Sequence, residues 1–147
     1  MNADQFFYLS GIEKRAGKQV YKKFGINRHE LNMLVGISAF LRLYNRKIIS
    51  RKLFTDWLDV NYGLEKRLWA YIQGLINKGA LHRLAYRRPD GNCLAISSYG
   101  MSILQAFDQA LQAISKQDKI LGTTYKDLTL DLDNIPQGYT LKQAGRN

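Results

Sequence analysis

The stretch from Leu64 to Gly79 constrains the fold more than any other part of the sequence, because its apolar residues follow the period of a helix. They recur at i, i+4, i+7 and i+8, which places them on one face. This buried stripe consists of Leu68, Ile72, Leu75 and Ile76. Gly79 stands where a left-handed residue often ends a helix. We therefore predict an amphipathic helix over residues 64–77, with Lys66, Arg67 and Gln73 off the stripe.

Two more helices are predicted before this stretch. Asn27 and Glu30 have the spacing of a capping box, and a strongly apolar segment follows to about Tyr44. Ser50 is a candidate N-cap for a shorter helix over residues 51–60. The buried face of that shorter helix is predicted to consist of Leu53, Phe54, Trp57 and Leu58.

The shorter helix and the amphipathic stretch are joined by residues 61–63. Two helices joined by a few residues, the second opening on basic side chains, have the arrangement of a helix-turn-helix motif. Further basic residues stand before and at the start of its first helix: Arg46, Lys47, Arg51 and Lys52. We expect these four to hold phosphates, and Lys66, Arg67 and Gln73 to reach bases. The alternative is an ordinary solvated helix face.

A β-hairpin is predicted directly after Gly79. Residues 80–86 and 93–97 are rich in strand formers, and an Asp-Gly turn signal separates them. The tip carries Arg87 and Arg88, so residues 81–97 have the character of a basic wing that can meet a minor groove or phosphates. The alternative is that the two arginines serve solubility.

Helices are also expected on both sides of this core. Residues 3–24 contain a capping-box pattern at Ser10 and Glu13, so a helix begins at Ser10 or runs continuously from an earlier residue. Residues 99–119 carry apolar side chains every three or four positions, close to a heptad seam. We interpret both segments as dimerisation helices. For the second, an internal core helix is the alternative.

The last segment, residues 120–147, gives weaker signals. Leu128, Leu130 and Leu132 alternate with polar residues, which indicates a short strand, and a turn is expected over residues 134–138. The final residues, TLKQAGRN, are expected to be mobile. We treat this segment as a C-terminal extension of a single domain, residues 1–147, whose core is residues 25–98.

The net charge of +10 indicates an anionic partner, and most of it falls in the middle of the chain. Residues 42–88 hold 11 Lys or Arg against 3 Asp or Glu, a net charge of +8. This concentration is typical of a nucleic-acid footprint. The single cysteine, Cys93, excludes an intrachain disulfide and fits a reducing cytoplasm. Neither a membrane span nor a signal peptide is indicated.

No pattern of residues indicates an enzyme, a cofactor site or a metal site. Nucleophile–base pairs and phosphate-binding glycine loops are not found, and the chain has only 2 His. Three aspartates near the C-terminus lack a partner at ligand spacing: Asp127, Asp131 and Asp133. His29 is expected to be a surface residue near a helix start. Cys93 is expected to be a small buried strand residue, with an oxidant sensor as the alternative.

From Phe24 to about Leu111 the chain resembles the winged-helix domain of the MarR family, the multiple-antibiotic-resistance type of transcriptional regulator. The segments that carry the resemblance are FGINRHELNML, LINKGAL and PDGNCLAISSYGMSIL. Two positions depart from the family pattern: Asp90-Gly91-Asn92 replaces Asp-x-Arg, and Ile96-Ser97 replaces Leu-Thr. We expect Arg87 or Arg88 to take the place of the missing arginine. The resemblance implies that the terminal helices of two chains interlock as a dimer, and that a small-molecule effector binds at the junction with the DNA-binding part.

These observations predict a mainly α protein with a small β-hairpin wing, a winged helix-turn-helix flanked by dimerisation helices. The expected function is a homodimeric, sequence-specific, double-stranded DNA-binding transcriptional regulator of the cytoplasm, with no cofactor and no membrane partner. Two-fold symmetry places the half-sites about one helical turn, roughly 34–36 Å, apart. The alternative is a winged-helix module for protein interaction or assembly in a mobile-element or replication complex.

Overall fold

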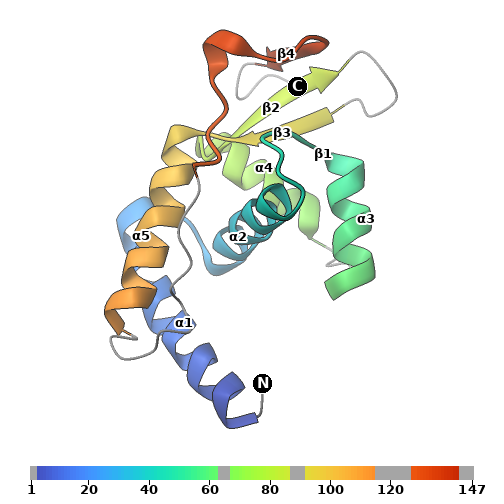
Figure 1. The fold of residues 1–147 in the computed structure, drawn as a ribbon. Coiled ribbons are helices and arrows are strands. Elements are labelled where there is room, and N and C mark those ends of the chain that lie inside the picture. Colours follow the sequence, from blue (N-terminus) through green and yellow to red (C-terminus); the bar gives the residue numbers. More distant parts are fainter. Residues whose placement is uncertain (1–2, 63–66, 87–91, 115–126, 143–147) are drawn as a thin grey trace.

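The helices and strands follow the order α1, α2, β1, α3, α4, β2, β3, α5, β4 (Figure 1). The computed structural model describes residues 3–62, 67–86, 92–114 and 127–142, and the side chains within these ranges except those of 3–10, 59–62 and 86. The helices are α1 (Ala3–Phe24), α2 (Arg28–Leu43), α3 (Arg51–Tyr62), α4 (Leu68–Asn77) and α5 (Ser98–Ile114). The strands are β1 (Ile49–Ser50), β2 (Leu81–Tyr86), β3 (Asn92–Ile96) and β4 (Tyr139–Lys142). The protein is therefore mainly helical with a small sheet, as the sequence predicts.

The local capping signals at α2 and α3 are confirmed. The Asn27 Oδ1 atom accepts a hydrogen bond from the Glu30 N–H at 2.8 Å, and Glu30 Oε1 accepts one from the Asn27 N–H at 3.0 Å. Ser50 Oγ accepts from the Leu53 N–H at 3.1 Å, so α3 begins at the predicted residue. Helix α1 is continuous through Ser10, so the capping-box start at that residue is wrong and the earlier start is right.

The sheet has the strand order β1-β3-β2-β4, and every neighbouring pair is antiparallel. The predicted β2–β3 hairpin is confirmed, with Leu84 opposite Cys93. Neither outer strand was predicted. Strand β1 has only two residues, directly before α3, and most of β4 lies in the segment expected to be mobile.

The strand predicted over residues 128–132 is wrong. Leu128 and Leu130 are buried, but the chain there is extended without a ladder partner and then forms a short 3-10 helix, Leu132–Asn134. Asp131 Oδ1 accepts the Asp133 N–H at 3.0 Å and so starts this turn of helix. The expected turn before Gly138 is present, because Gly138 has a φ of +93° and β4 follows it.

Two apolar clusters cover the two faces of the sheet. The larger one joins all five helices to the face that carries Leu94 and Ile96. The smaller one lies on the opposite face and contains Leu84, Cys93 and Leu130. The C-terminal segment therefore covers the outer face of the sheet as well as extending its edge, and β4 lies at the end of the molecule opposite the N-terminus (Figure 1).

Helix α5 packs along α1 within one chain (Figure 1). Ser97 caps it by accepting the Gly100 N–H at 3.0 Å. Of the predicted seam, Met101, Leu104 and Phe107 are buried within the chain, and Leu111 and Ile114 are partly buried. Ile103 and Ala110, which widen the apolar surface of α5, are buried as well. The width of this surface therefore does not by itself require a second copy, and homodimerisation stays a prediction.

The predicted buried face of α3 needs one correction. Phe54 is fully buried and Trp57 packs against it with ring centroids 6.2 Å apart, but Leu53 is 43% exposed. Neighbouring residues in a helix point about 100° apart, so with Phe54 facing the core Leu53 turns toward solvent. Helix α3 also runs to Tyr62, two residues beyond its predicted end.

Candidate nucleic-acid interface

Helix α4 is buried along the predicted stripe, and its other face is turned outward. Leu68, Ile72, Leu75 and Ile76 are each at most 3% exposed, and they pack against α2 and β2. Gly79 has a φ of +80°, as expected for the residue that ends the helix. The buried stem therefore holds α4 firmly and leaves its other face free to bind a partner.

The start of α4 differs from the prediction. The helix begins at Leu68 rather than Leu64, and Arg67 occupies the N-cap position without a capping hydrogen bond from its side chain. Helix α3 extends to Tyr62 and α4 begins at Leu68, so the residues between them include those assigned to the first turn of α4. Arg67 is exposed at this N-terminus, and Lys66 lies outside the described residues.

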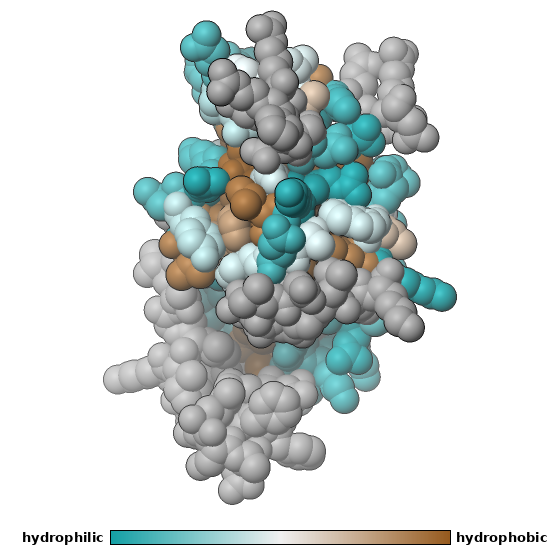
Figure 2. All heavy atoms as spheres, turned by 90° about the vertical axis from the view of Figure 1, so that its right-hand side faces the viewer, coloured by the Kyte–Doolittle hydropathy of each residue, from teal (hydrophilic) through white to brown (hydrophobic). Residues whose placement is uncertain are grey.

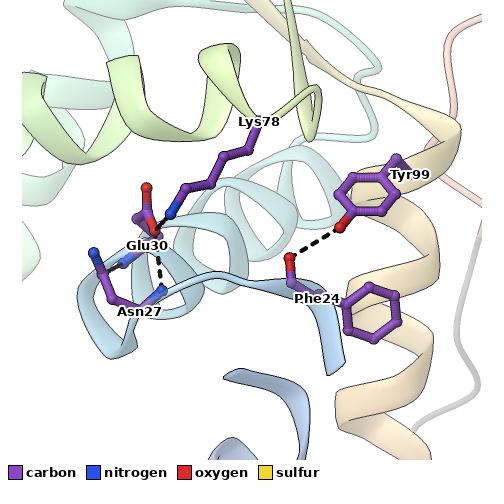
Figure 3. A network of polar contacts seen from close by, with 5 residues as sticks. All are labelled: Phe24, Asn27, Glu30, Lys78 and Tyr99. Atoms are coloured by element: carbon purple, nitrogen blue, oxygen red, sulfur yellow. Dashed lines mark hydrogen bonds and ion pairs between the residues drawn. The ribbon is translucent and has the colours of Figure 1, made fainter. Parts of the chain in front are cut away.

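A buried carboxylate fixes the C-terminal end of α4 to the start of α2 (Figure 3). Lys78 Nζ lies 2.6 Å from Glu30 Oε1, the same oxygen that accepts the Asn27 N–H. The Glu30 side chain is only 4% exposed, whereas that of Lys78 is 40% exposed. Gly74 of α4 lies directly against the other oxygen of this carboxylate, so α2 and α4 approach closely here.

A second contact in Figure 3 joins the ends of α1 and α5. The Tyr99 hydroxyl donates a hydrogen bond to the Phe24 carbonyl at 2.9 Å, and the two rings meet edge to face with centroids 5.8 Å apart. The Phe24 contact precedes the connection between α1 and α2, and the contacts of Glu30 with Asn27 follow it, so this connection is fixed at both of its ends.

The outward face of α4 presents polar and aromatic groups. Trp69 is 42% exposed, and the guanidinium of Arg51 lies over its ring, 3.9 Å from the ring centroid. Gln73 is half-buried, and its amide donates to Asn77 Oδ1 at 2.8 Å. The Gln73 amide keeps a second N–H and its carbonyl oxygen for another partner. This face combines a stacking surface, a cation and an amide, which are the groups that contact nucleic acids.

The four predicted phosphate contacts gather around β1 and the start of α3. Arg46, Lys47 and Lys52 are exposed, and Arg51 is half-buried. Figure 2 looks onto the side of the molecule that carries α3, where hydrophilic side chains surround a smaller hydrophobic area. Three of the four cations are therefore freely accessible, and Arg51 is held against α4.

Lys47 lies in a less basic environment than the other three. A hydrogen bond from the Thr129 N–H is the main reason that the pKa of Asp127 falls below its ordinary value, and the charge of Lys47 contributes a smaller part. Hydrogen bonds from Asn134 and Asp133 lower the pKa of Asp131, with the same smaller contribution from Lys47. These carboxylates offset part of the positive charge that Lys47 offers to a phosphate.

Arg83, in the middle of β2, was not among the predicted contacts. Its Nε atom and that of Arg51 are both buried without a hydrogen-bond partner among the described residues. Burial lowers the pKa of Arg51, and the positive charge of Arg83 lowers it further. The strand pattern of β2 gave no sign of this juxtaposition, because it depends on how α3 packs on the sheet. The wing arginines, Arg87 and Arg88, lie outside the described residues.

The remaining candidate residues are buried in the fold or make contacts within it. Cys93 is buried in β3, as predicted, and the exposed His29 stacks on Tyr71 with ring centroids 4.7 Å apart. Asp127 Oδ1 accepts the Thr129 N–H at 2.9 Å and so shapes a turn. Within the described ranges, no group of three His, Cys, Asp or Glu is placed to hold a metal ion.

An open, mostly apolar cavity of about 710 Å³ lies between α1, α2, α3 and α5. Its lining includes Ile12, Val35, Trp57, Phe107 and Leu111, with Glu13 and Asn32 as polar groups.

Among the described helices, none combines the length and apolar character needed to cross a membrane. Comparisons with family models, curated proteins and solved structures find no match for this chain.

Proposed function

We propose that this protein is a winged helix-turn-helix that binds double-stranded DNA as a homodimeric, sequence-specific transcriptional regulator. The order α3, α4, β2, β3 supports this proposal, because a pair of short helices is followed at once by a hairpin. The observation that carries it is the outward face of α4, where Arg51 lies on Trp69 beside the exposed Arg67. The resemblance to the MarR family is part of this proposal.

In the proposed complex, α4 enters a major groove with its N-terminus toward the base edges. Arg67 and Gln73, with Lys66, contact bases, because a cation and an amide are suited to guanine and adenine edges respectively. Arg46, Arg51 and Lys52 contact phosphates on one side, and the tip of the wing with Arg87 and Arg88 contacts the backbone or the adjacent minor groove.

The proposed dimer uses the free surfaces of α1 and α5 beyond their mutual contact. Leu111 and Ile114 near the end of α5 are only half-buried, so this end of the helix has apolar surface left for a second copy. The apolar cavity between the helices is a suitable place for a small-molecule effector. If each protomer neutralises roughly 4 phosphates, the slope of log K against log salt is about −7 for the dimer.

The decisive experiment is the selection of bound duplexes from a random DNA pool at about physiological salt. We expect one enriched inverted repeat whose half-sites lie roughly 34–36 Å apart. If no sequence is enriched and binding disappears as salt rises, sequence-specific regulation is refuted and only a basic surface remains.

Variants of the outward face test the assignment of base contacts. Gln73→Ala and Arg67→Ala are expected to reduce discrimination between the selected duplex and a scrambled one, by about 1–3 kcal/mol for each good contact. Arg28→Ala, at an exposed position at the start of α2, is the matched control and leaves discrimination unchanged. Equal losses on both duplexes would assign Arg67 to phosphates instead.

A second function is favoured by the exposed apolar groups on the same helix pair. Leu53 is 43% exposed and Trp69 is 42% exposed, and both large apolar side chains suit a protein partner. In that case the module assembles with an acidic protein, and duplex DNA does not compete for the surface. Adding duplex DNA to the complex with the acidic protein partner, and measuring whether the partner is displaced, separates the two functions.

A further inference from the structure

The C-terminal strand brings a third cation to the base of the hairpin. Arg83 of β2 and Lys142 of β4 are Cα partners in an antiparallel pair, so their side chains lie on the same face of the sheet. Arg83 is also opposite Leu94 of β3, which is buried in the larger apolar cluster. Arg83 and Lys142 therefore share the face of the sheet against which the helices pack.

Arg51 reaches this face from the start of α3. Helix α3 contacts both β1 and β3, and the charge of Arg83 is close enough to contribute to the lowered pKa of Arg51. The Arg51 guanidinium also lies over the ring of Trp69, 3.9 Å from the ring centroid. Arg83 is thus close to the charge of Arg51 and is the cross-strand partner of Lys142, so it connects the three cations from α3, β2 and β4.

This arrangement is unfavourable without an anion. Like charges directly opposite each other across two strands repel, and burial of guanidinium atoms increases the cost. Among the described residues, no carboxylate forms an ion pair with Arg51, Arg83 or Lys142. The Nε atoms of both arginines also lack a hydrogen-bond partner within the described chain.

From this juxtaposition we infer that Arg51, Arg83 and Lys142 form a binding site for a phosphate of the DNA backbone, and that β4 is part of the DNA interface. A phosphate oxygen is a strong acceptor for guanidinium N–H groups, and its charge relieves the repulsion among the three cations. The site adjoins α4 where Arg51 lies over the ring of Trp69.

The inference rests on the proposed function and extends it beyond residues 25–98. It assigns a role in DNA binding to the C-terminal segment, which covers the outer face of the sheet and contains β4. It also adds Arg83 of β2 to the cations that are proposed to contact phosphates. Contacts to phosphate position the protein on the duplex without reading its sequence.

The test measures binding to the selected duplex and to a scrambled duplex over a range of salt concentrations. Arg83→Met and Lys142→Met keep an apolar stem and remove the charge. Because the dimer carries each substitution twice, each variant is expected to reduce the magnitude of the slope of log K against log salt by about 1.8, which corresponds to roughly thirtyfold weaker binding at 0.15 M salt, equally on both duplexes. Arg28→Met at the start of α2 is the control and changes neither quantity.

The outcomes separate the inference from the function on which it rests. If the wild-type protein binds no duplex, the proposed function fails. If it binds and both Met variants keep its slope and affinity, the phosphate site is refuted and the function stands. Unfolding of each variant by urea, without DNA and in buffer free of phosphate and sulfate, must show no loss of stability, because removing one of three repelling charges does not weaken the fold.

A separate arm identifies the source of the phosphate group. Inorganic phosphate is titrated against the wild-type protein and Arg83→Met while thermal unfolding is followed. An increase in Tm for the wild type alone supports the three-cation site. If inorganic phosphate raises the wild-type Tm and the Met variants leave duplex binding unchanged, the site serves a free anion, and its assignment to DNA is overturned.

Discussion

Gly74→Ala is expected to destabilise the protein, although the same change in most helices has the opposite effect. A glycine in a helix interior is about 1 kcal/mol less favourable than alanine. At this position, however, a Cβ atom collides with Glu30 Oε2, and the whole Glu30 side chain is only 4% exposed. Because the carboxylate is planar, moving Oε2 also moves Oε1 away from the Asn27 N–H and from Lys78.

The expected size follows from the bonds that are lost. A hydrogen bond to a charged group contributes about 1.5–3 kcal/mol, and the lower end applies here because Lys78 is 40% exposed. The capping bond to Asn27 adds about 0.5–1 kcal/mol. After subtraction of the gain in helix propensity, Gly74→Ala is expected to reduce the free energy of unfolding by about 1–1.5 kcal/mol. Urea unfolding with an unchanged m-value measures this difference.

A double-mutant cycle with Glu30→Ala tests the reasoning. In that background the collision is absent, so Gly74→Ala is expected to stabilise the protein by up to about 1 kcal/mol. The sign of the effect therefore reverses between the two backgrounds. If Gly74→Ala stabilises the wild-type protein by as much as it stabilises Glu30→Ala, the buried carboxylate does not hold α4 against α2, and the reasoning is refuted.

Three further predictions concern the same fold. Gly100→Ala places a Cβ against the Ala80 carbonyl and is expected to reduce Tm, whereas Gly11→Ala meets open space and is expected to raise stability by about 0.5–1 kcal/mol; thermal unfolding of the pair compares them. Ser97→Ala removes the cap of α5 at a buried residue and is expected to cost about 1–2 kcal/mol in urea unfolding, and a change near zero would contradict the capping role. Burial lowers the pKa of His82, so the unfolded state binds a proton more readily and stability falls as the pH drops below about 6.5; His82→Gln should lessen this fall between pH 7 and pH 5.

Sequence patterns predicted the elements whose determinants are close together along the chain. The capping box of Asn27 and Glu30, the cap at Ser50 and the β2–β3 hairpin each depend on residues within a few positions of one another. The stripe of α4 was also correct, since a period of 3.6 residues is visible in sequence. The predicted start of α4 was wrong, because the residue at which α4 begins depends on where α3 ends.

The features that were missed depend on partners distant in sequence. Strand β1 exists only because Ile49 and Ser50 pair with Leu94 and Cys93 of β3. Strand β4 depends on β2 in the same way. Of the alternating leucines before it, which matched a strand pattern, Leu130 covers the outer face of the sheet, Leu128 packs into the larger cluster and Leu132 is exposed. The position of Arg83 beside Arg51 requires both the register of the sheet and the packing of α3. Such pairings are not encoded in any short stretch of the chain.

The way α4 is held allows its position and its binding to be separated by experiment. Its buried stripe and the Glu30–Lys78 contact fix the helix from within, whereas Arg67 makes no capping bond from its exposed side chain. Arg67→Ala should therefore weaken binding without changing the free energy of unfolding, because it removes no packing. Gly74→Ala should change both, since it moves the helix that presents Arg67. A loss of binding in Gly74→Ala at full stability would mean that contact with a partner depends on flexibility of α4 rather than on its fixed position.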